Sequence, residues 1–100
     1  MTRVYKIDEV QPMRTFQGKE NGMTVDVQAL GITLTDGRNT LYAEAYRAVA
    51  ENTVKMNLHK GDLVQVHLRC NATPRDTEKG RFWSNSFTID ALQLLARDSF

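Results

Sequence analysis

The sequence has a single cysteine and no long apolar run. Because Cys70 has no partner, one chain can build neither an internal disulfide nor a cysteine-rich metal site. No apolar stretch approaches the roughly 20 residues that cross a bilayer. Residues 1–5 also lack the apolar segment of a secretory signal. We therefore expect a cytoplasmic protein with no membrane partner.

The net charge is also small, at +1 with 13 Lys or Arg and 12 Asp or Glu. This balance argues against a protein that is held to nucleic acid by charge alone. The charges are unevenly distributed, however, and residues 60–81 hold five basic and three acidic side chains: Lys60, Arg69, Arg75, Lys79 and Arg81 against Asp62, Asp76 and Glu78. Such a local excess can follow a phosphate backbone.

Internal repeats, low-complexity tracts and long linkers are missing too, which predicts one domain over 1–96 with a short end at 97–100. Turn-forming residues divide the chain at 18–22, 36–39, 60–62 and 74–80. Five strand-like runs lie between these turns, at 3–16, 23–35, 40–46, 64–73 and 81–95. A helix-like run spans 47–56, where Glu51 and Lys55 lie one turn apart.

Three details refine these strands. In 3–16 the apolar residues follow no clean period and Pro12 cannot donate to a sheet ladder, which predicts a bent or interrupted strand. In 23–35 the apolar alternation changes phase beside Gly31, as at a β-bulge. The run at 64–73 alternates most regularly, and Cys70 shares its apolar face. We therefore expect a buried, inert thiol at Cys70.

The order strand, strand, strand, helix, strand, strand is the order of the OB-fold. In that fold the helix between the third and fourth strands closes the bottom of the barrel. An SH3-like or other small barrel also has five antiparallel strands, so the position of the helix is what separates the alternatives. The predicted fold is all-β, a five-stranded OB-fold Greek-key barrel with one short helix between strands 3 and 4.

The helix-like run and the residues after it carry a distinctive pattern: Ala45-Tyr46-Arg47-Ala48-Val49-Ala50-Glu51-Asn52, then Lys55, then Lys60-Gly61-Asp62-Leu63-Val64-Gln65-Val66. Two further segments belong to it, Val4-Tyr5-Lys6-Ile7 and Gly80-Arg81-Phe82-Trp83. Over most of the chain this pattern resembles the bacterial single-stranded DNA-binding protein (SSB) family. That family's acidic tail has no counterpart in Arg97-Asp98-Ser99-Phe100, so a short, tail-less SSB-like or primosomal B-type protein is the closer comparison.

The resemblance implies sequence-tolerant binding of single-stranded DNA by a homodimer or homotetramer. Tyr46 falls where the family places a base-stacking aromatic at the end of the third strand. Thr40 stands roughly where many members have a stacking tryptophan, which implies weaker binding. Replication, repair, phage, plasmid and conjugation roles all stay open.

The residues themselves support a stacking face, because flat rings bind any base while cations meet the phosphates. Alternation places Tyr42, Tyr46 and Phe82 on polar faces. Trp83 alternates with the core set, so we expect it to pack, although a shift of one residue exposes it. The candidate nucleic-acid-binding set is Tyr42, Tyr46, Arg69, Arg75, Lys79, Arg81, Phe82 and Trp83.

Enzymatic activity, a metal and a cofactor are not expected. His59 and His67 lack neighbours at ligand spacing, and no nucleophile motif or phosphate-cradling glycine loop is present. Two alternatives to binding single-stranded DNA stay open. One is a protein-interaction or assembly module that keeps the barrel without nucleic-acid affinity. The other is an RNA-binding OB protein of the cold-shock type.

Overall fold

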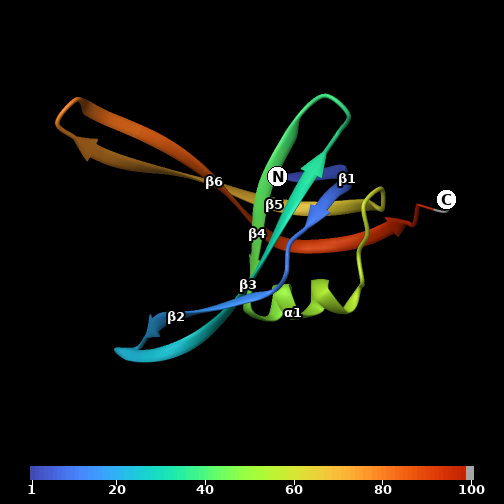
Figure 1. Cartoon of the computed structure of the whole chain (residues 1–100), viewed down its shortest axis with the longest axis horizontal. Helices are drawn as coiled ribbons and strands as arrows, with labels where there is room; N and C mark the ends of the chain where they lie inside the picture. Colours follow the sequence, from blue (N-terminus) through green and yellow to red (C-terminus); the bar gives the residue numbers. More distant parts are fainter. Residues whose placement is uncertain (99–100) are drawn as a thin grey trace.

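The computed structural model describes residues 1–98, which form six strands and one helix (Figure 1). The elements are β1 (Thr2–Val10), β2 (Arg14–Glu20), β3 (Met23–Thr35), β4 (Thr40–Tyr46), α1 (Arg47–Lys55), β5 (Leu63–Thr77) and β6 (Gly80–Ala96). Within this part of the chain, no helix is long and apolar enough to cross a membrane.

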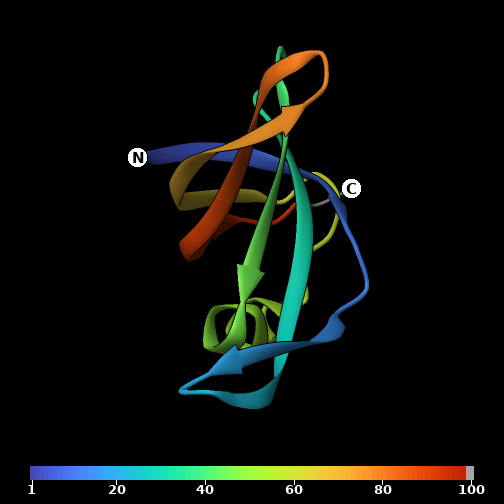
Figure 2. The same cartoon turned by 90° about the vertical axis from the view of Figure 1, so that its left-hand side faces the viewer.

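Five of the strands close into a ring in the order β1, β5, β6, β4, β3, because β1 pairs with both β5 and β3. All of these pairings are antiparallel except that of β4 with β6. The helix α1 follows β4 and lies at one end of the ring, against β3, β4 and β6 (Figures 1 and 2). The predicted strand order and helix position are confirmed.

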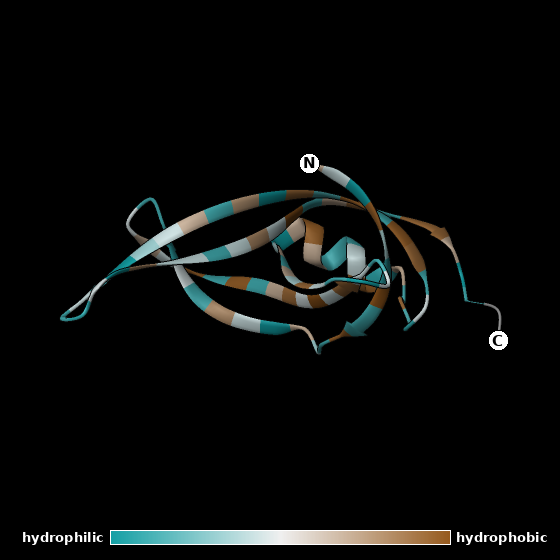
Figure 3. Cartoon of the chain, turned by 90° about the horizontal axis from the view of Figure 1, so that it is seen from above, coloured by the Kyte–Doolittle hydropathy of each residue, from teal (hydrophilic) through white to brown (hydrophobic). Residues whose placement is uncertain are grey.

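The ring encloses an apolar core. Its buried members are Ile7, Leu30, Ile32, Leu34, Ala43, Ala45, Ala50, Val64, Val66, Leu68 and Ile89. Figure 3 shows apolar segments around the helix and the centre of the ring, whereas the hairpin tip at the left is hydrophilic. The inward positions follow the two-residue period of each strand, as the alternation in the sequence predicts.

The first run is interrupted at 11–13, as the proline predicts, and so gives two strands, β1 and β2. Beyond the break, β2 pairs with β3 alone among the described residues, and the two form a hairpin that projects from the ring (Figure 1). Its turn is the pair Asn21-Gly22, with φ of 52° and 77°, the geometry that a two-residue hairpin turn requires. The turn is shorter than the predicted 18–22, because 18–20 belong to β2.

The bulge predicted at Gly31 is wrong, because β3 pairs with β2 and β4 without a shift of register. The apolar phase changes there because 29–32 are buried on both faces of the strand. Register does shift in β6, where Asp90 and Leu95 have no partner in β5. The bulge at Asp90 brings Leu92 and Leu94 back to the core side after Ile89.

The hairpin of β5 and β6 extends beyond the ring. Beyond Leu68, β5 pairs only with β6 among residues 1–98, because β1 starts there: the Leu68 N–H donates to the Met1 carbonyl at 2.7 Å. Such an edge tolerates Pro74, which lies opposite Trp83. The turn is shorter than the predicted 74–80, since β5 continues to Thr77 and β6 starts at Gly80.

Two predictions of burial fail on this hairpin for one reason. Cys70 is exposed, not buried, and Trp83 is 61% exposed instead of packed. Both residues do alternate with the core set along their strands, as the sequence indicates. They lie beyond the stretch of β5 that pairs with β1, however, where no strand or helix among residues 1–98 covers that side of the hairpin.

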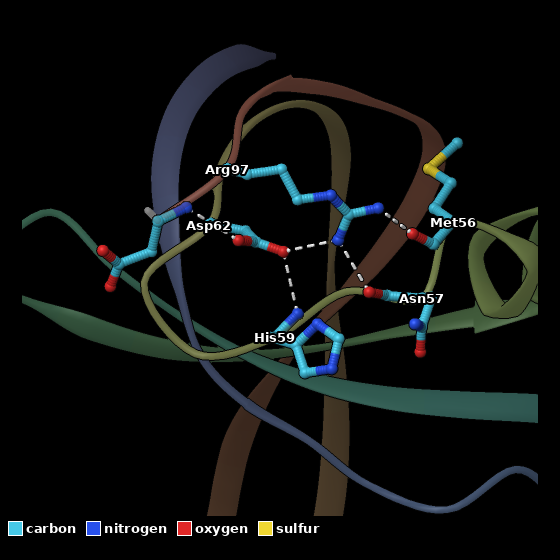
Figure 4. Close-up of polar contacts among 6 residues, drawn as sticks. Met56, Asn57, His59, Asp62 and Arg97 are labelled. Atoms are coloured by element: carbon cyan, nitrogen blue, oxygen red, sulfur yellow. Dashed lines mark hydrogen bonds and ion pairs between the residues drawn. The ribbon is translucent and has the colours of Figure 1, made fainter. Parts of the chain in front are cut away.

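A buried carboxylate, that of Asp62, holds Arg97 and Asp98 against the segment that follows α1 (Figure 4). Asp62 is 1% exposed. Its Oδ2 accepts hydrogen bonds from the His59 N–H at 2.9 Å and from Arg97 at 3.0 Å, and its Oδ1 accepts the Asp98 N–H at 3.0 Å. Arg97 also donates to the carbonyls of Met56 and Asn57, just after α1. Arg97 and Asp98 of the predicted short end thus contact the barrel; residues 99–100 lie outside the described residues.

Candidate nucleic-acid interface

Three aromatic rings lie on the outer face of the sheet formed by β2, β3 and β4. The β2–β3 and β5–β6 hairpins project on the same side of the barrel (Figures 1 and 2). Phe16 comes from β2, and Tyr42 and Tyr46 come from β4. Phe16 and Tyr42 are each 42% exposed. The Phe16 and Tyr46 rings meet edge to face, with centroids 6.3 Å apart and planes at 84°, an arrangement that aromatic pairs favour. Partial burial raises the pKa of Tyr46.

Tyr42 lies against a position of β3 that has no side chain. Its ring packs on Gly31 of β3, where an added Cβ would lie only 2.9 Å from the Tyr42 Cε1. Gly31 is consequently buried although it faces outward. Only glycine leaves room for the ring to lie this close to the sheet, and the Tyr42 side chain remains partly exposed to solvent.

An ion pair lies among these rings. Glu44, between the two tyrosines along β4, accepts a hydrogen bond from Arg14 of β2. This bond, followed by a weaker one to Tyr42, raises the pKa of Arg14. The side chain of Glu44 is 23% exposed. The centre of the aromatic face is therefore electrically balanced, and it carries a carboxylate that is fixed in place.

A cleft of about 330 Å³ opens beside this face, between β4 and β6. The two strands pair only at Ala43 with Phe87 and at Glu44 with Thr88, and they separate on the side toward the projecting hairpin. The cleft is lined by Thr40, Leu41, Tyr42, Glu44, Tyr46, Asn85, Ser86, Phe87 and Thr88. It has one aromatic wall and several hydroxyl groups.

The predicted hairpin residues fall on two faces. Arg69 lies opposite Thr88, on the side of the cleft, and pairs with Asp90 at 3.0 Å. Phe82 and Arg75 lie opposite one another, on the strand face that Ser86 also shares, because side chains alternate. Phe82 lies four positions before Ser86 on β6, so it is about 13 Å from the cleft along the strand.

Arg81 and Trp83 lie on the other face of this hairpin. Arg81 bonds Asp76 at 2.9 Å, and its guanidinium carbon lies 5.9 Å from the centre of the Trp83 ring. Neither Arg75 nor Lys79 forms an ion pair among residues 1–98, so both keep an uncompensated charge. The structure thus places Tyr42 and Tyr46 on one face of β4, four residues apart, brings Phe16 to Tyr46, and places the basic hairpin residues farther along one strand.

Phe16, Arg14 and Glu44 were missed in the sequence. The signal that identifies the first two is the Asn21-Gly22 turn. A two-residue turn there fixes the register of its flanking strands and sets Phe16 opposite Val27. Glu44 carries no sequence signal for a nucleic-acid interface, because its carboxylate has the same sign of charge as a phosphate.

No family model matches the sequence, and no curated protein sequence matches it. Solved structures do match. The mitochondrial single-stranded DNA binding protein Rim1 of S. cerevisiae is 15% identical with a TM-score of 0.66, over 100% of this chain and 96% of that one. The second OB-fold domain of replication protein A from Methanococcus maripaludis is 14% identical with a TM-score of 0.63, over 99% and 86%. At such identities the likeness establishes the fold: this chain is an OB-fold barrel.

Proposed function

We propose that the protein binds single-stranded DNA, largely without regard to sequence, across the outer face of β3 and β4. The observation that carries this proposal is a set of three partly exposed rings on one sheet face: Phe16 and Tyr46 in contact, and Tyr42 four residues away along β4. The likeness to a single-stranded DNA binding protein over the whole chain supports it.

The rings supply the affinity for bases. Each base that stacks on an aromatic side chain adds about 1–3 kcal/mol to the binding free energy, whichever of the four bases it is. The Tyr42 ring already packs against Gly31, and the Phe16 and Tyr46 rings contact one another edge to face. Little side-chain freedom is therefore lost on binding, which preserves affinity.

The phosphates require cations from elsewhere, because Glu44 neutralises Arg14 at the centre of the face. Arg75 and Lys79 on the β5–β6 hairpin supply them. A strand that leaves the cleft along β6 passes Phe82 and Arg75 on the same face of the hairpin. The bound path therefore runs from the aromatic cluster toward the hairpin tip.

A titration of oligo(dT) at several salt concentrations tests this proposal. We expect saturable quenching of Tyr and Trp83 fluorescence that weakens with salt, because each neutralised phosphate of a single strand contributes about −0.7 to the slope of log K against log[salt]. Replacing Arg75 and Lys79 by alanine should make the slope shallower by about 1.4, for two lost contacts.

The matched control replaces Lys55 and Lys60, at the helix end of the barrel, by alanine. The control variant should keep the slope of the parent protein. The same change of slope in both double variants contradicts the proposed path, and no binding of any single strand at low salt contradicts the function itself.

Gly31→Ala provides a separate test of the aromatic face. The new Cβ overlaps the Tyr42 ring, and the ring can swing into solvent because its side chain ends at the surface. We expect a change of less than about 1 kcal/mol in the free energy of unfolding, with a loss of oligo(dT) affinity close to that of Tyr42→Ala. Urea denaturation and the same titration measure both. Full affinity in Gly31→Ala means that the ring position is irrelevant to binding.

A protein-interaction module is the second candidate function. It is favoured by the number of arginines that are already paired with acids on the two hairpins and the adjoining sheet: Arg14, Arg47, Arg69 and Arg81. In that case Tyr42→Ala changes the sedimenting mass of the protein and leaves oligonucleotide binding undetectable in both forms. Parallel titrations with oligo(U) separate DNA binding from RNA binding.

A further inference from the structure

We infer that the cleft between β4 and β6 takes up one base of the bound strand and prefers guanine. This inference rests on the proposed binding of single-stranded DNA and adds a site of base preference to an otherwise sequence-tolerant face. It starts from one feature that sequence-tolerant binding does not explain, the carboxylate of Glu44 in the wall of the cleft.

The cleft suits a base better than a phosphate. Its volume of about 330 Å³ lies at the lower end of the range of small-ligand sites, about 300–1,000 Å³. Tyr42 and Tyr46 offer ring surfaces on one side. Among residues 1–98 the lining of the cleft includes no basic side chain, and the nearby Arg14 is already paired with Glu44, so a phosphate finds no free cation there. The polar edge of a base carries no net charge and needs none.

The carboxylate has acceptor capacity left for that edge. An ionised carboxylate offers about four acceptor sites and no donor. Arg14 occupies one of these sites and holds the group in place. The hydroxyls of Ser86 and Thr88 line the opposite side of the cleft, and each can either donate or accept. The Glu44 side of the cleft therefore selects donors.

The four bases differ in how many donors they bring together. The Watson–Crick edge of guanine carries two adjacent donors, the N1–H and the 2-amino group, which match the two oxygens of a carboxylate. The thymine edge carries one N–H between two carbonyl oxygens, both of which face the negative charge unfavourably. Adenine and cytosine each carry one amino group beside an acceptor nitrogen. Single-stranded bases expose this edge for recognition, so Glu44 favours guanine and opposes thymine.

Fluorescence anisotropy with labelled 15-residue oligonucleotides tests the preference. The probes are oligo(dT) and oligo(dT) with one central dG, dI, dA or dC. We expect the dG probe to bind at least about 5-fold tighter than oligo(dT), the lower end for a bidentate base contact. The dI probe, which lacks the 2-amino group, should fall between them. In Glu44→Gln the ratio of dG to dT affinity should drop below about 2-fold.

Glu51→Gln is the matched control, because Glu51 lies on the exposed face of α1, away from the cleft. It should keep the dG preference of the parent protein. Binding of oligo(dT) with no preference among the probes overturns this inference and leaves the proposed function standing, as does a preference that persists in Glu44→Gln. Failure of every probe to bind the parent protein overturns both.

Discussion

Replacing both Tyr42 and Tyr46 by alanine is expected to weaken binding of oligo(dT) by about 30-fold or more, because two stacking rings at about 1 kcal/mol each are lost at the lower limit. The loss should be seen at every salt concentration with little change in the salt slope, since no cation is removed. A fluorescence or anisotropy titration at fixed salt measures it.

Val4→Ala is the control for this pair. Val4 is an exposed apolar residue of β1, which does not pair with β4 or β6. Circular dichroism should show the same fold in all three proteins. If the tyrosine double variant binds as well as Val4→Ala, the outer face of β4 is not the binding surface, and the exposed Phe82 and Trp83 of the hairpin become the aromatic groups to test.

Replacing Asp62 by asparagine is expected to lower the thermal midpoint at pH 7 by about 8 °C or more, on the scale of about 4–8 °C per kcal/mol for a domain of this size. Both carboxylate oxygens accept hydrogen bonds, from the N–H groups of His59 and Asp98 and from Arg97. An amide of the same shape places an NH₂ group against one of these donors. Buried groups left without an acceptor are strongly destabilising.

The effect of Asp62→Asn should depend on pH in a defined direction. Hydrogen bonds from the backbone of His59 and Asp98, helped by the charge of Arg97, lower the pKa of Asp62 below 3.8 in the folded state. The unfolded chain therefore takes up the proton first as the pH falls. The contribution of the carboxylate is complete above about pH 4 and is lost as the pH approaches the folded pKa.

The difference in thermal midpoint between the parent protein and Asp62→Asn should therefore shrink below pH 3.8. Asp90→Asn serves as the comparison, since Asp90 forms an exposed ion pair with Arg69 and should change the midpoint by only a few degrees. A difference for Asp62→Asn that stays constant from neutral to strongly acidic pH contradicts this account of the buried network.

Much of the fold could be predicted because its signals are local. The strands 23–35 and 40–46 have the predicted limits, and α1 lies where the alanine-rich run indicates. Two-residue alternation and turn chemistry act over a few neighbouring residues, so they are readable without knowing the barrel. Within the candidate site, alternation alone places Tyr42 and Tyr46 on the outer face, where the structure has them.

The bulges and the burial of some apolar positions could not be predicted, because the same sequence pattern can arise from different contacts in the folded barrel. The apolar phase changes both in 23–35 and in 89–95, yet only the second change is a bulge. In the first, the ring of Tyr42 buries Gly31 from outside. Whether an apolar position is covered also depends on how far the closed sheet of the barrel extends along each strand. The sequence of one strand does not encode this length.

The sequence alone therefore determined the order of strands and helix, the inward and outward sides of each strand, and the break at Pro12. The tertiary structure decided which outward residues meet. It brought Phe16 of β2 to Tyr46, placed Glu44 in a cleft beside β6, and left Cys70 and Trp83 exposed beyond the ring. The physical reason is that alternation is set by neighbouring residues, whereas contacts between strands are set by the register and closure of the whole barrel.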